Sequence, residues 1–282
     1  MATVTTVPKL ELEADRALVN AALAQALGGD GTAAGGAVSD AMRYAVLGAG
    51  QRIRPILALR LARLLEAPQR LTTRAAVSVE FFHAASLIID DLPCMDDDEM
   101  RRNRPAVHRA FGEATAILAA FGLVALAARS LNVDDGSRAE REALLGFQRR
   151  LLGALDCSGL IAGQALDLGI PEGPGRFDLV SIAEFKTVPL FDLAARAGIL
   201  FADLPRSERD ELIRFGRDFG TAFQLVDDYL DGDLQDPGLA MARLEAARMR
   251  LAPYGDRAQE VLDLVNYLDA RLTQHPRSRN AA

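Results

Sequence analysis

Lysine is nearly missing from this sequence, which contains only Lys9 and Lys186 among 32 lysine and arginine residues. A codon bias toward arginine explains such scarcity, so a lysine that persists at position 186 is notable. Chance survival of one lysine is the alternative that composition leaves open. The net charge of −7 argues against a nucleic-acid partner, because such partners are bound by basic surfaces.

Cysteine and long apolar runs are also scarce. Cys94 and Cys157 provide neither a disulfide framework nor a paired-cysteine metal motif, so we expect both to be reduced. No apolar run reaches the roughly 18 residues that a bilayer span requires. Residues 1–12 lack the charged-then-apolar pattern of a secretory signal. These absences predict a soluble, cytoplasmic protein.

Strand patterns, repeats and linkers are absent as well, and apolar residues recur at helical spacing along most of the chain. We therefore predict an all-α fold in one domain over residues 1–282, with a core at about 12–272 and loose ends at 1–11 and from Pro276 on. Helices are expected at 12–27, 39–47, 55–67, 74–91, 113–131, 138–161, 207–227, 239–252 and 256–272, with a loop at 171–175.

The most acidic stretch of the chain, residues 86–102, begins with an apolar run that leads into Asp90 and Asp91. More acidic residues and an arginine pair follow Pro93: Asp96, Asp97, Asp98, Glu99, Arg101 and Arg102. Crowded, partly buried carboxylates need a compensating cation, and Mg²⁺ shared with a substrate phosphate is a suitable one. The arginines either neutralise the cluster or bind phosphate oxygens. The stretch predicts a metal site beside an anion site, with a solvated acidic loop as the alternative.

A second acidic group follows another apolar helical run far downstream. It contains Asp227, Asp228 and Asp231, with Gln224 about one turn earlier. Asp227 and Asp231 are four residues apart, so they share one face of a helix. Two such groups in one helical chain would let metal ions hold a single diphosphate from both sides. Two motifs in matching contexts are also much more specific than one.

Several other polar residues have both a structural and a functional interpretation. Residues 48–55 form a glycine-rich turn with two arginines ahead of a helix, which suits an anion but is, taken alone, an ordinary helix corner. His83 lies two turns before Asp90 on roughly the same face, although a histidine on a buried helix is usually a core residue. Lys186 needs an anion if it is buried, or extends to the surface if it is not.

Together these stretches resemble the trans-type polyprenyl diphosphate synthases, nearest to the bacterial and plant geranylgeranyl diphosphate synthases. The two aspartate-rich motifs are that family's signature, and the resemblance covers about 41–271. Residues 50–55 resemble the GGKRxRP motif, with Gln51 in place of its lysine. Residues 163–168 resemble GQxxDL, and Lys186 with Thr187 matches a Lys-Thr-Gly segment.

The sequence also departs from the family pattern. The Gly-Asp pair usual in the middle of one apolar helix falls on Ala120 and Phe121, and the segment 232–238 lacks the family's lysines. These departures leave two alternatives open: a terpene synthase on the same fold, or a weakly active partner subunit. A ferritin-type metal binder is disfavoured, because the Glu-x-x-His ligands of that fold are missing.

The resemblance implies a helical bundle of the isoprenoid synthase type around a central apolar cavity. It implies Mg²⁺-dependent condensation of isopentenyl diphosphate with an allylic diphosphate, giving geranylgeranyl or farnesyl diphosphate. Roughly two to three Mg²⁺ ions, or Mn²⁺ instead, would be held by Asp90, Asp96 and Asp227.

The resemblance also implies roles for the remaining site residues. The catalytic group would add Asp91, Asp228, Asp231 and Lys186 to the metal ligands. Residues that bind the substrates would be Gln51, Arg52, Arg54, His83, Arg101, Arg102, Gln164, Asp167, Lys186, Thr187 and Gln224. Ala85 and Ser86 are small, which leaves room for a geranylgeranyl product. Family members are commonly homodimers, so a homodimer is expected here.

Overall fold

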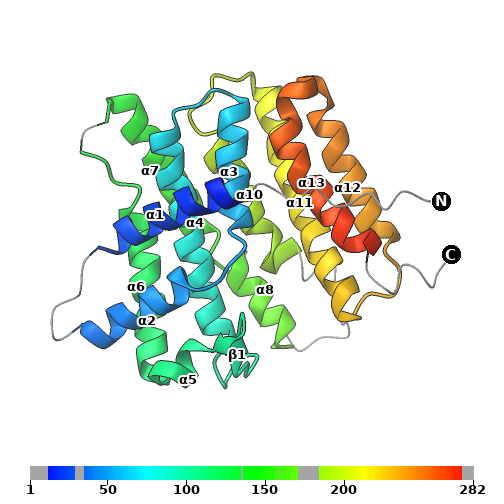
Figure 1. Ribbon diagram of the computed structural model, residues 1–282. Helices are drawn as coiled ribbons and strands as arrows, with labels where there is room; N and C mark the ends of the chain where they lie inside the picture. The colour runs from blue at the N-terminus through cyan, green and yellow to red at the C-terminus, as the bar shows by residue number, and fades with distance from the viewer. Residues whose placement is uncertain (1–11, 29–34, 135, 158, 171–183, 275–282) are drawn as a thin grey trace.

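The computed structural model describes residues 12–28, 35–134, 136–157, 159–170 and 184–274 (Figure 1). The loose ends expected at 1–11 and from Pro276 on, and the loop expected at 171–175, lie outside these residues. The described helices are α1 (Glu13–Leu27), α2 (Gly36–Leu47), α3 (Ile53–Leu64), α4 (Gln69–Asp90), α5 (Val107–Phe111), α6 (Glu113–Arg129), α7 (Arg138–Gly153), α8 (Leu160–Asp167), α10 (Val188–Gly198), α11 (Arg206–Asp231), α12 (Gly238–Leu251) and α13 (Gln259–Gln274), with a 3₁₀ helix at Ala252–Ala258.

Helix α4 lies inside the bundle and carries the first acidic motif at its carboxyl end. It packs against α1, α2, α3, α6, α7 and α10, and Figure 1 shows it among these helices. Phe81 and Phe82 are almost fully buried in the core, as expected for a helix that is apolar on most sides. The buried position of α4 therefore brings Asp90 toward the interior of the molecule.

Helices α10 and α11 pack unusually closely, and this contact sets the position of the second acidic motif. A Cβ atom at Gly216 would lie 2.4 Å from the Ala195 Cβ and 3.0 Å from the Phe191 carbonyl oxygen. A Cβ at Gly220, one turn later, would lie 2.7 Å from the Phe191 Cβ. Because glycine has no side chain at these two positions, α11 can approach α10 closely and direct its carboxyl end toward the same interior as α4.

The structure differs from the predicted helices in three places, one of which is the short helix α5, where no helix was predicted. The amphipathic stretch at 138–161 is not one helix, because α7 ends at Gly153 and α8 begins at Leu160. The chain turns tightly between them, and a Cβ at Gly159 would lie 2.2 Å from the Ala154 carbonyl oxygen. Helix α10 was not predicted, although a proline in its first turn is a favourable helix start.

A short hairpin also interrupts the helical pattern just after the first acidic motif. Strand β1 (Met100–Arg101) pairs antiparallel with β2 (Arg104–Pro105). The two residues between them, Arg102 and Asn103, have positive φ angles of 53° and 62°, as a tight hairpin turn requires. Two-residue strands have too little alternation to be recognised in a sequence. The hairpin places Arg101 and Arg102 back against the end of α4.

No helix in the described part of the chain is long and apolar enough to cross a bilayer. The two cysteines, Cys94 and Cys157, are both unpaired thiols, consistent with the absence of a disulfide framework in the sequence.

Candidate functional site

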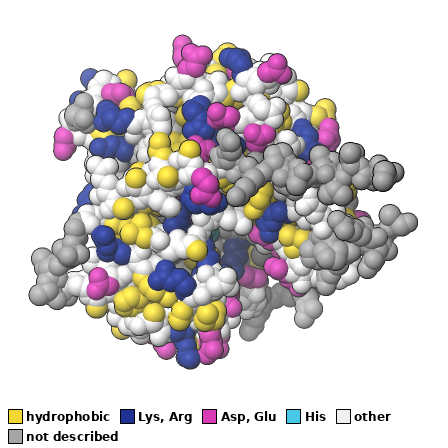
Figure 2. Space-filling view, viewed as in Figure 1, with side chains coloured by type: hydrophobic (Ala, Val, Ile, Leu, Met, Phe, Trp, Pro, Cys, Tyr) yellow, Lys and Arg dark blue, Asp and Glu magenta, His cyan; other side chains and the backbone are white. Residues whose placement is uncertain are grey.

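One large cavity of about 1310 Å³ brings most of the predicted site residues together. The predicted residues that line it are Gln51, Arg52, Arg54, His83, Ala85, Ser86, Asp90, Arg101, Arg102, Gln164, Asp167, Lys186, Thr187, Gln224, Asp227 and Asp228. Figure 2 shows a hollow near the centre of the molecular face, with basic side chains at its rim. Asp91, Asp96 and Asp231 do not line the cavity.

In the first acidic motif, the neighbouring carboxylates Asp90 and Asp91 have different environments. Asp90 lines the cavity, and burial raises its pKa to about 6, with further contributions from the charges of Asp96 and Asp91 and an opposing one from Lys186. Asp91 is almost fully buried and accepts hydrogen bonds from Arg101, one of them 2.8 Å long. Asp91 therefore orients the Arg101 guanidinium, while Asp90 is directed into the cavity.

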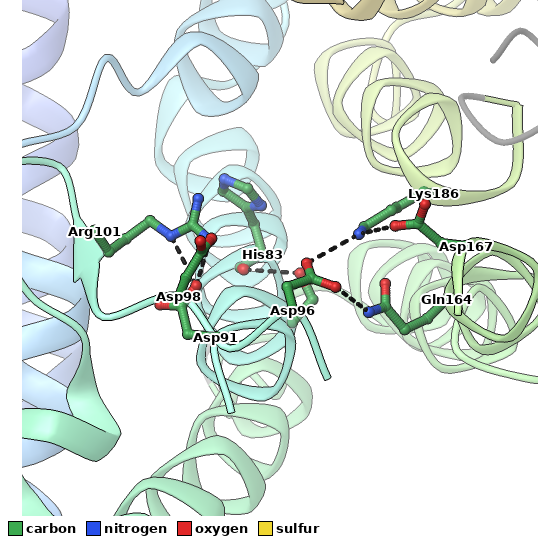
Figure 3. A network of polar contacts seen from close by, with 9 residues as sticks. His83, Asp91, Asp96, Asp98, Arg101, Gln164, Asp167 and Lys186 are labelled. Atoms are coloured by element: carbon green, nitrogen blue, oxygen red, sulfur yellow. Dashed lines mark hydrogen bonds and ion pairs between the residues drawn. The ribbon is translucent and has the colours of Figure 1, made fainter. Parts of the chain in front are cut away.

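Asp96 lies opposite Gln164 and Asp167 of α8 and Lys186, which precedes α10, as Figure 3 shows. Its carboxylate is 3.4 Å from Lys186 Nζ and 3.3 Å from Gln164 Nε2. Lys186 also donates a 2.6 Å hydrogen bond to Asp167. Burial lowers the pKa of Lys186, but the hydrogen bond to Asp167 and the charge of Asp90 outweigh it, so the net pKa is raised. Lys186 is therefore a cation held between carboxylates.

The close approach of α8 to Lys186 depends on Gly163. A Cβ at this position would lie 2.8 Å from the Lys186 backbone nitrogen and 2.7 Å from the Phe185 carbonyl carbon. Gly163 is thus a packing residue, and it allows Gln164 to face the same site as Lys186.

The second acidic motif is held by a chain of hydrogen bonds to α10 and by an ion pair to α13. Thr187 donates to Gln224 over 2.7 Å, and Gln224 in turn donates to Asp228 over 2.7 Å. Asp227 pairs with Arg271 at 2.8 Å. Burial raises the pKa of Asp227, although Arg271 opposes the shift. Asp231 is exposed at the end of α11.

Arg271 was not predicted as a site residue. It lies on the last described helix, 44 residues beyond Asp227 in the sequence. No local spacing rule connects residues so far apart, so only the packing of α13 on α11 reveals this partner.

Arg54, Arg102 and His83 line the same cavity as the acidic groups and are called the cationic wall below. Arg54 Nη1 is 3.2 Å from His83 Nε2, and the Arg54 guanidinium lies 4.5 Å from the Phe191 ring centre. Burial lowers the pKa of Arg54 to about 10 and lowers that of Arg102 as well. Burial and the nearby arginines hold the pKa of His83 well below 6.5, so its imidazole is neutral at physiological pH.

Two atoms of this wall are buried without a hydrogen-bond partner among the described residues: Arg54 Nε and His83 Nδ1. Leaving buried polar atoms unpaired costs free energy. Their unused hydrogen-bonding capacity, next to a buried guanidinium, matches the needs of an anionic ligand with several oxygen atoms.

Arg52 has a different environment from Arg54, although both belong to the same motif. Its guanidinium donates to four acceptors: Asn20 Oδ1 at 2.9 Å, Glu80 Oε1 at 2.8 Å, and the carbonyl oxygens of Val46 and Gly48. The side chain is almost fully buried. With its donors satisfied inside the protein, Arg52 joins α1, α2 and α4 at the base of the wall.

Much of the remaining lining of the cavity is apolar. Ala85 is buried on α4, and Ser86 uses its hydroxyl to bond the His83 carbonyl oxygen at 3.0 Å. Beyond these small residues the lining continues through Phe82, Ile89, Ala120, Phe121, Val124 and Leu160. The cavity therefore combines charged side chains with an apolar lining. Such a lining suits an amphiphilic ligand with a charged head and a hydrocarbon tail.

The predicted metal ligands do not form a metal cage on their own. Among the described residues, no three Asp, Glu, His or Cys side chains lie close enough together to hold a metal ion. The donors present at the site are carboxylate oxygens, as Mg²⁺ prefers, and Mg²⁺ usually takes one or two carboxylates and completes its coordination with water and substrate phosphates. Carboxylates with pKa values raised by burial are also suitable neighbours for a cation. The donor set therefore fits a magnesium ion shared with a phosphate-bearing ligand.

Comparison with known proteins agrees with this arrangement. Residues 36–236 match the model of the polyprenyl synthetase family. Geranylgeranyl pyrophosphate synthase 4 of Arabidopsis thaliana is 40% identical over 198 residues, covering 69% of this chain and 52% of the relative. The large subunit 2 of a heterodimeric geranylgeranyl pyrophosphate synthase from the same plant is 38% identical over 199 residues, with the same coverage. The match thus spans about half the length of these relatives.

Solved structures show that the likeness extends to the fold. An FPP/GFPP synthase from Zymomonas mobilis superposes with a TM-score of 0.83 at 29% identity, covering 91% of this chain and 98% of that one. A geranyltransferase from Legionella pneumophila gives a TM-score of 0.84 at 28% identity, covering 92% and 96%. The predicted all-α fold of the isoprenoid synthase type is confirmed.

Proposed function

The chain belongs to the polyprenyl synthetase family, and from this premise we propose that it condenses isopentenyl diphosphate with an allylic diphosphate in a Mg²⁺-dependent reaction. The product proposed is geranylgeranyl diphosphate, with farnesyl diphosphate as the shorter alternative. The observation that carries the proposal is the placement of Asp90 and Asp227, which come from different helices, on one cavity that also contains a cationic wall and an apolar extension.

The acidic side of the cavity is proposed to receive the allylic diphosphate. Asp90, Asp96 and Asp227 would hold the magnesium ions, roughly two to three of them, with Mn²⁺ as a substitute. Bound there, the ions would neutralise the diphosphate and weaken the C–O bond to the allylic carbon. Lys186, Arg101 and Gln224 would donate hydrogen bonds to the leaving diphosphate, and Asp91 would keep Arg101 in position.

The second substrate is proposed to bind on the cationic wall. Arg54 and Arg102 would hold the diphosphate of isopentenyl diphosphate, and the neutral His83 would donate a hydrogen bond to it. The isopentenyl double bond would then attack the allylic carbon as the C–O bond breaks, and one proton would be lost to the released diphosphate. The apolar lining excludes water, which would otherwise capture the allylic cation.

Product length is proposed to depend on the start of the apolar extension. Ala85 and Ser86 border the cavity next to Asp90, where a growing chain would pass. Their side chains are small, and Ala120 and Val124 line the same cavity. This favours a geranylgeranyl product over a shorter one.

Self-association is proposed from the surface of α6. Leu118 and Phe121 are 56% and 68% exposed, and Ile117 lies on the same side of the helix. Large apolar side chains clustered on one exposed helix face indicate an interaction surface. A second copy of this chain is the proposed partner, and one relative is described as a subunit of a heterodimer.

The proposed activity is tested by incubating the purified protein with isopentenyl diphosphate, Mg²⁺ and each allylic primer in turn, followed by sizing of the products. A condensed geranylgeranyl product supports the proposal, and Asp90→Ala or Asp227→Ala should abolish its formation. Diphosphate release with a cyclic hydrocarbon would instead identify a terpene synthase. Inactivity alone, with activity restored by a second synthase chain, would identify a partner subunit.

A further inference from the structure

We propose that Arg16 on α1 is a further diphosphate-binding residue and belongs to the isopentenyl diphosphate site. The inference rests on the proposed function of the cavity. Arg16 lies outside the sequence motifs, on a helix that precedes the first of them.

Arg16 lines the cavity together with the glycine-rich turn that precedes α3. The turn residues Gly50, Gln51 and Arg52 line the same cavity, as do Arg54 and Arg102. The side chain of Arg16 is 30% exposed, so it lies at the rim rather than at the base. From there the guanidinium can reach a ligand bound on the cationic wall.

A hydrogen bond fixes α1 against this turn. Asn20 accepts a 2.9 Å hydrogen bond from Arg52 Nε. Arg16 precedes Asn20 by four residues, so both lie on the same face of α1. The bond that anchors Asn20 next to Arg52 thus also holds Arg16 on the side of α1 that lines the cavity with Gln51 and Arg52.

The Arg16 guanidinium is not saturated by the protein. Its Nε is buried without a hydrogen-bond partner among the described residues. Its Nη1 contacts Glu13 at 2.8 Å, but the Glu13 side chain is 84% exposed. Ion pairs of this kind at the surface contribute little. A phosphate oxygen could satisfy Nε and compete readily with Glu13.

The positive charge of the cationic wall is also smaller than the negative charge of a bound diphosphate. Gln51 is neutral, and the guanidinium of Arg52 is committed to four acceptors inside the protein. Arg54 and Arg102 are then the guanidinium groups that face the ligand, and a diphosphate carries more negative charge than two of them offset. Arg16 would supply the third, in the fork geometry that suits phosphate oxygens.

The test compares Arg16→Gln and Arg16→Lys with wild type in steady-state kinetics. Arg16→Gln should raise KM for isopentenyl diphosphate about tenfold, the effect of one lost charged contact of roughly 1.4 kcal/mol. KM for the allylic primer and the melting temperature should stay unchanged, and Arg16→Lys should recover part of the loss. Arg206→Gln, which removes an arginine that is 95% exposed, is the matched control and should behave as wild type.

A binding measurement separates failure of this inference from failure of the proposed function. Inorganic pyrophosphate is titrated into the protein calorimetrically without divalent ions, when the acidic side of the cavity repels the anion and binding reports the cationic wall. Arg16→Gln should weaken this binding even if wild type proves to be inactive as a synthase. Unchanged pyrophosphate affinity, or a KM that rises equally for both substrates with a lowered melting temperature, would overturn the inference.

Discussion

At the scale of single residues, neighbouring side chains of the same type do different work because their partners differ. Arg52 and Arg54 are two positions apart, yet the first donates to four protein acceptors and the second keeps a buried Nε without a partner among the described residues. Asp90 and Asp91 differ in a similar way: Asp90 lines the cavity, whereas Asp91 does not and accepts a hydrogen bond from Arg101. Burial and hydrogen-bond partners thus distinguish residues that bind from residues that position.

The role of Arg52 can be tested through stability. Arg52→Gln should lower the free energy of unfolding by about 3–5 kcal/mol, because it leaves the buried Glu80 carboxylate without its counter-charge. Urea denaturation followed by circular dichroism measures the change, with Arg206→Gln as the surface control. A loss below about 1 kcal/mol together with a large rise in KM would instead assign Arg52 to substrate binding.

Asp90 gives a prediction about pH. Its pKa is raised from 3.8 to about 6, chiefly by burial, so the folded protein binds this proton more tightly than the unfolded chain. The stability that results is present below about pH 4 and is lost as pH rises through about 6. In EDTA at pH 8, Asp90→Asn should therefore be more stable than wild type by on the order of 2–3 kcal/mol.

The advantage of Asp90→Asn should shrink as the pH is lowered toward 5, and urea denaturation at both pH values measures it. Added Mg²⁺ should stabilise wild type more than the variant, because the metal requires the ionised carboxylate. An advantage that is independent of pH would show that Asp90 ionises with an ordinary pKa.

At the scale of the elements, the two acidic motifs depend on how closely α10 approaches α11. Helix α10 carries Phe191 under the Arg54 guanidinium and is preceded by Thr187, which bonds Gln224 on α11. A Cβ at Gly216 would lie only 2.4 Å from the Ala195 Cβ on α10. A small change in their spacing would thus move residues on both sides of the cavity.

Gly216→Ala tests this contact. The new Cβ would meet Ala195 and the Phe191 backbone, and overpacking of this kind costs about 1–3 kcal/mol. That cost should exceed the gain of up to about 1 kcal/mol that alanine brings to a helix interior. Gly146→Ala on α7 is the matched control, because a Cβ there meets nothing within 4 Å and the substitution should be neutral or stabilising. Equal effects in thermal unfolding would contradict the importance of the contact.

Sequence patterns predicted a large part of this arrangement, and what they missed has a physical cause. Helical periodicity located most helices, and the spacing of Asp227 after an apolar run placed it on an inward face. The break between α7 and α8 was missed because a tight turn at Gly159 leaves the apolar periodicity on both sides intact. The Arg271–Asp227 ion pair and the burial of Arg52 were missed because they depend on packing between distant segments, which local spacing does not encode.

At the scale of the whole molecule, the acidic and cationic sides of one cavity are assembled from helices spread over most of the chain, from α1 to α11. The apolar part of the cavity reaches α6, whose outer face remains exposed. Phe121 on α6 belongs both to the cavity lining and to the exposed face, of which it is a 68% exposed residue. The proposed partner copy would cover this face.

Phe121→Glu should convert the proposed dimer into a monomer, because it would bury a charge against an apolar surface. Sedimentation velocity at several protein concentrations measures the change in mass. Met249→Glu on α12 is the control, since Met249 is equally exposed at 68% and lies away from α6. A wild-type protein that already sediments as a monomer would contradict the proposed interface.

The central claim is that Asp90 and Asp227 act on the same diphosphate, and a double-mutant cycle on ligand binding tests it most directly. The affinity of an allylic diphosphate is measured calorimetrically in the presence of Mg²⁺ for wild type, Asp90→Ala, Asp227→Ala and the double variant. We expect each single substitution to remove nearly all of the Mg²⁺-dependent affinity, so that the double variant loses little more than either one. Losses that simply add, or an Asp227→Ala variant that binds as wild type does, would show that the two aspartates do not share one ligand.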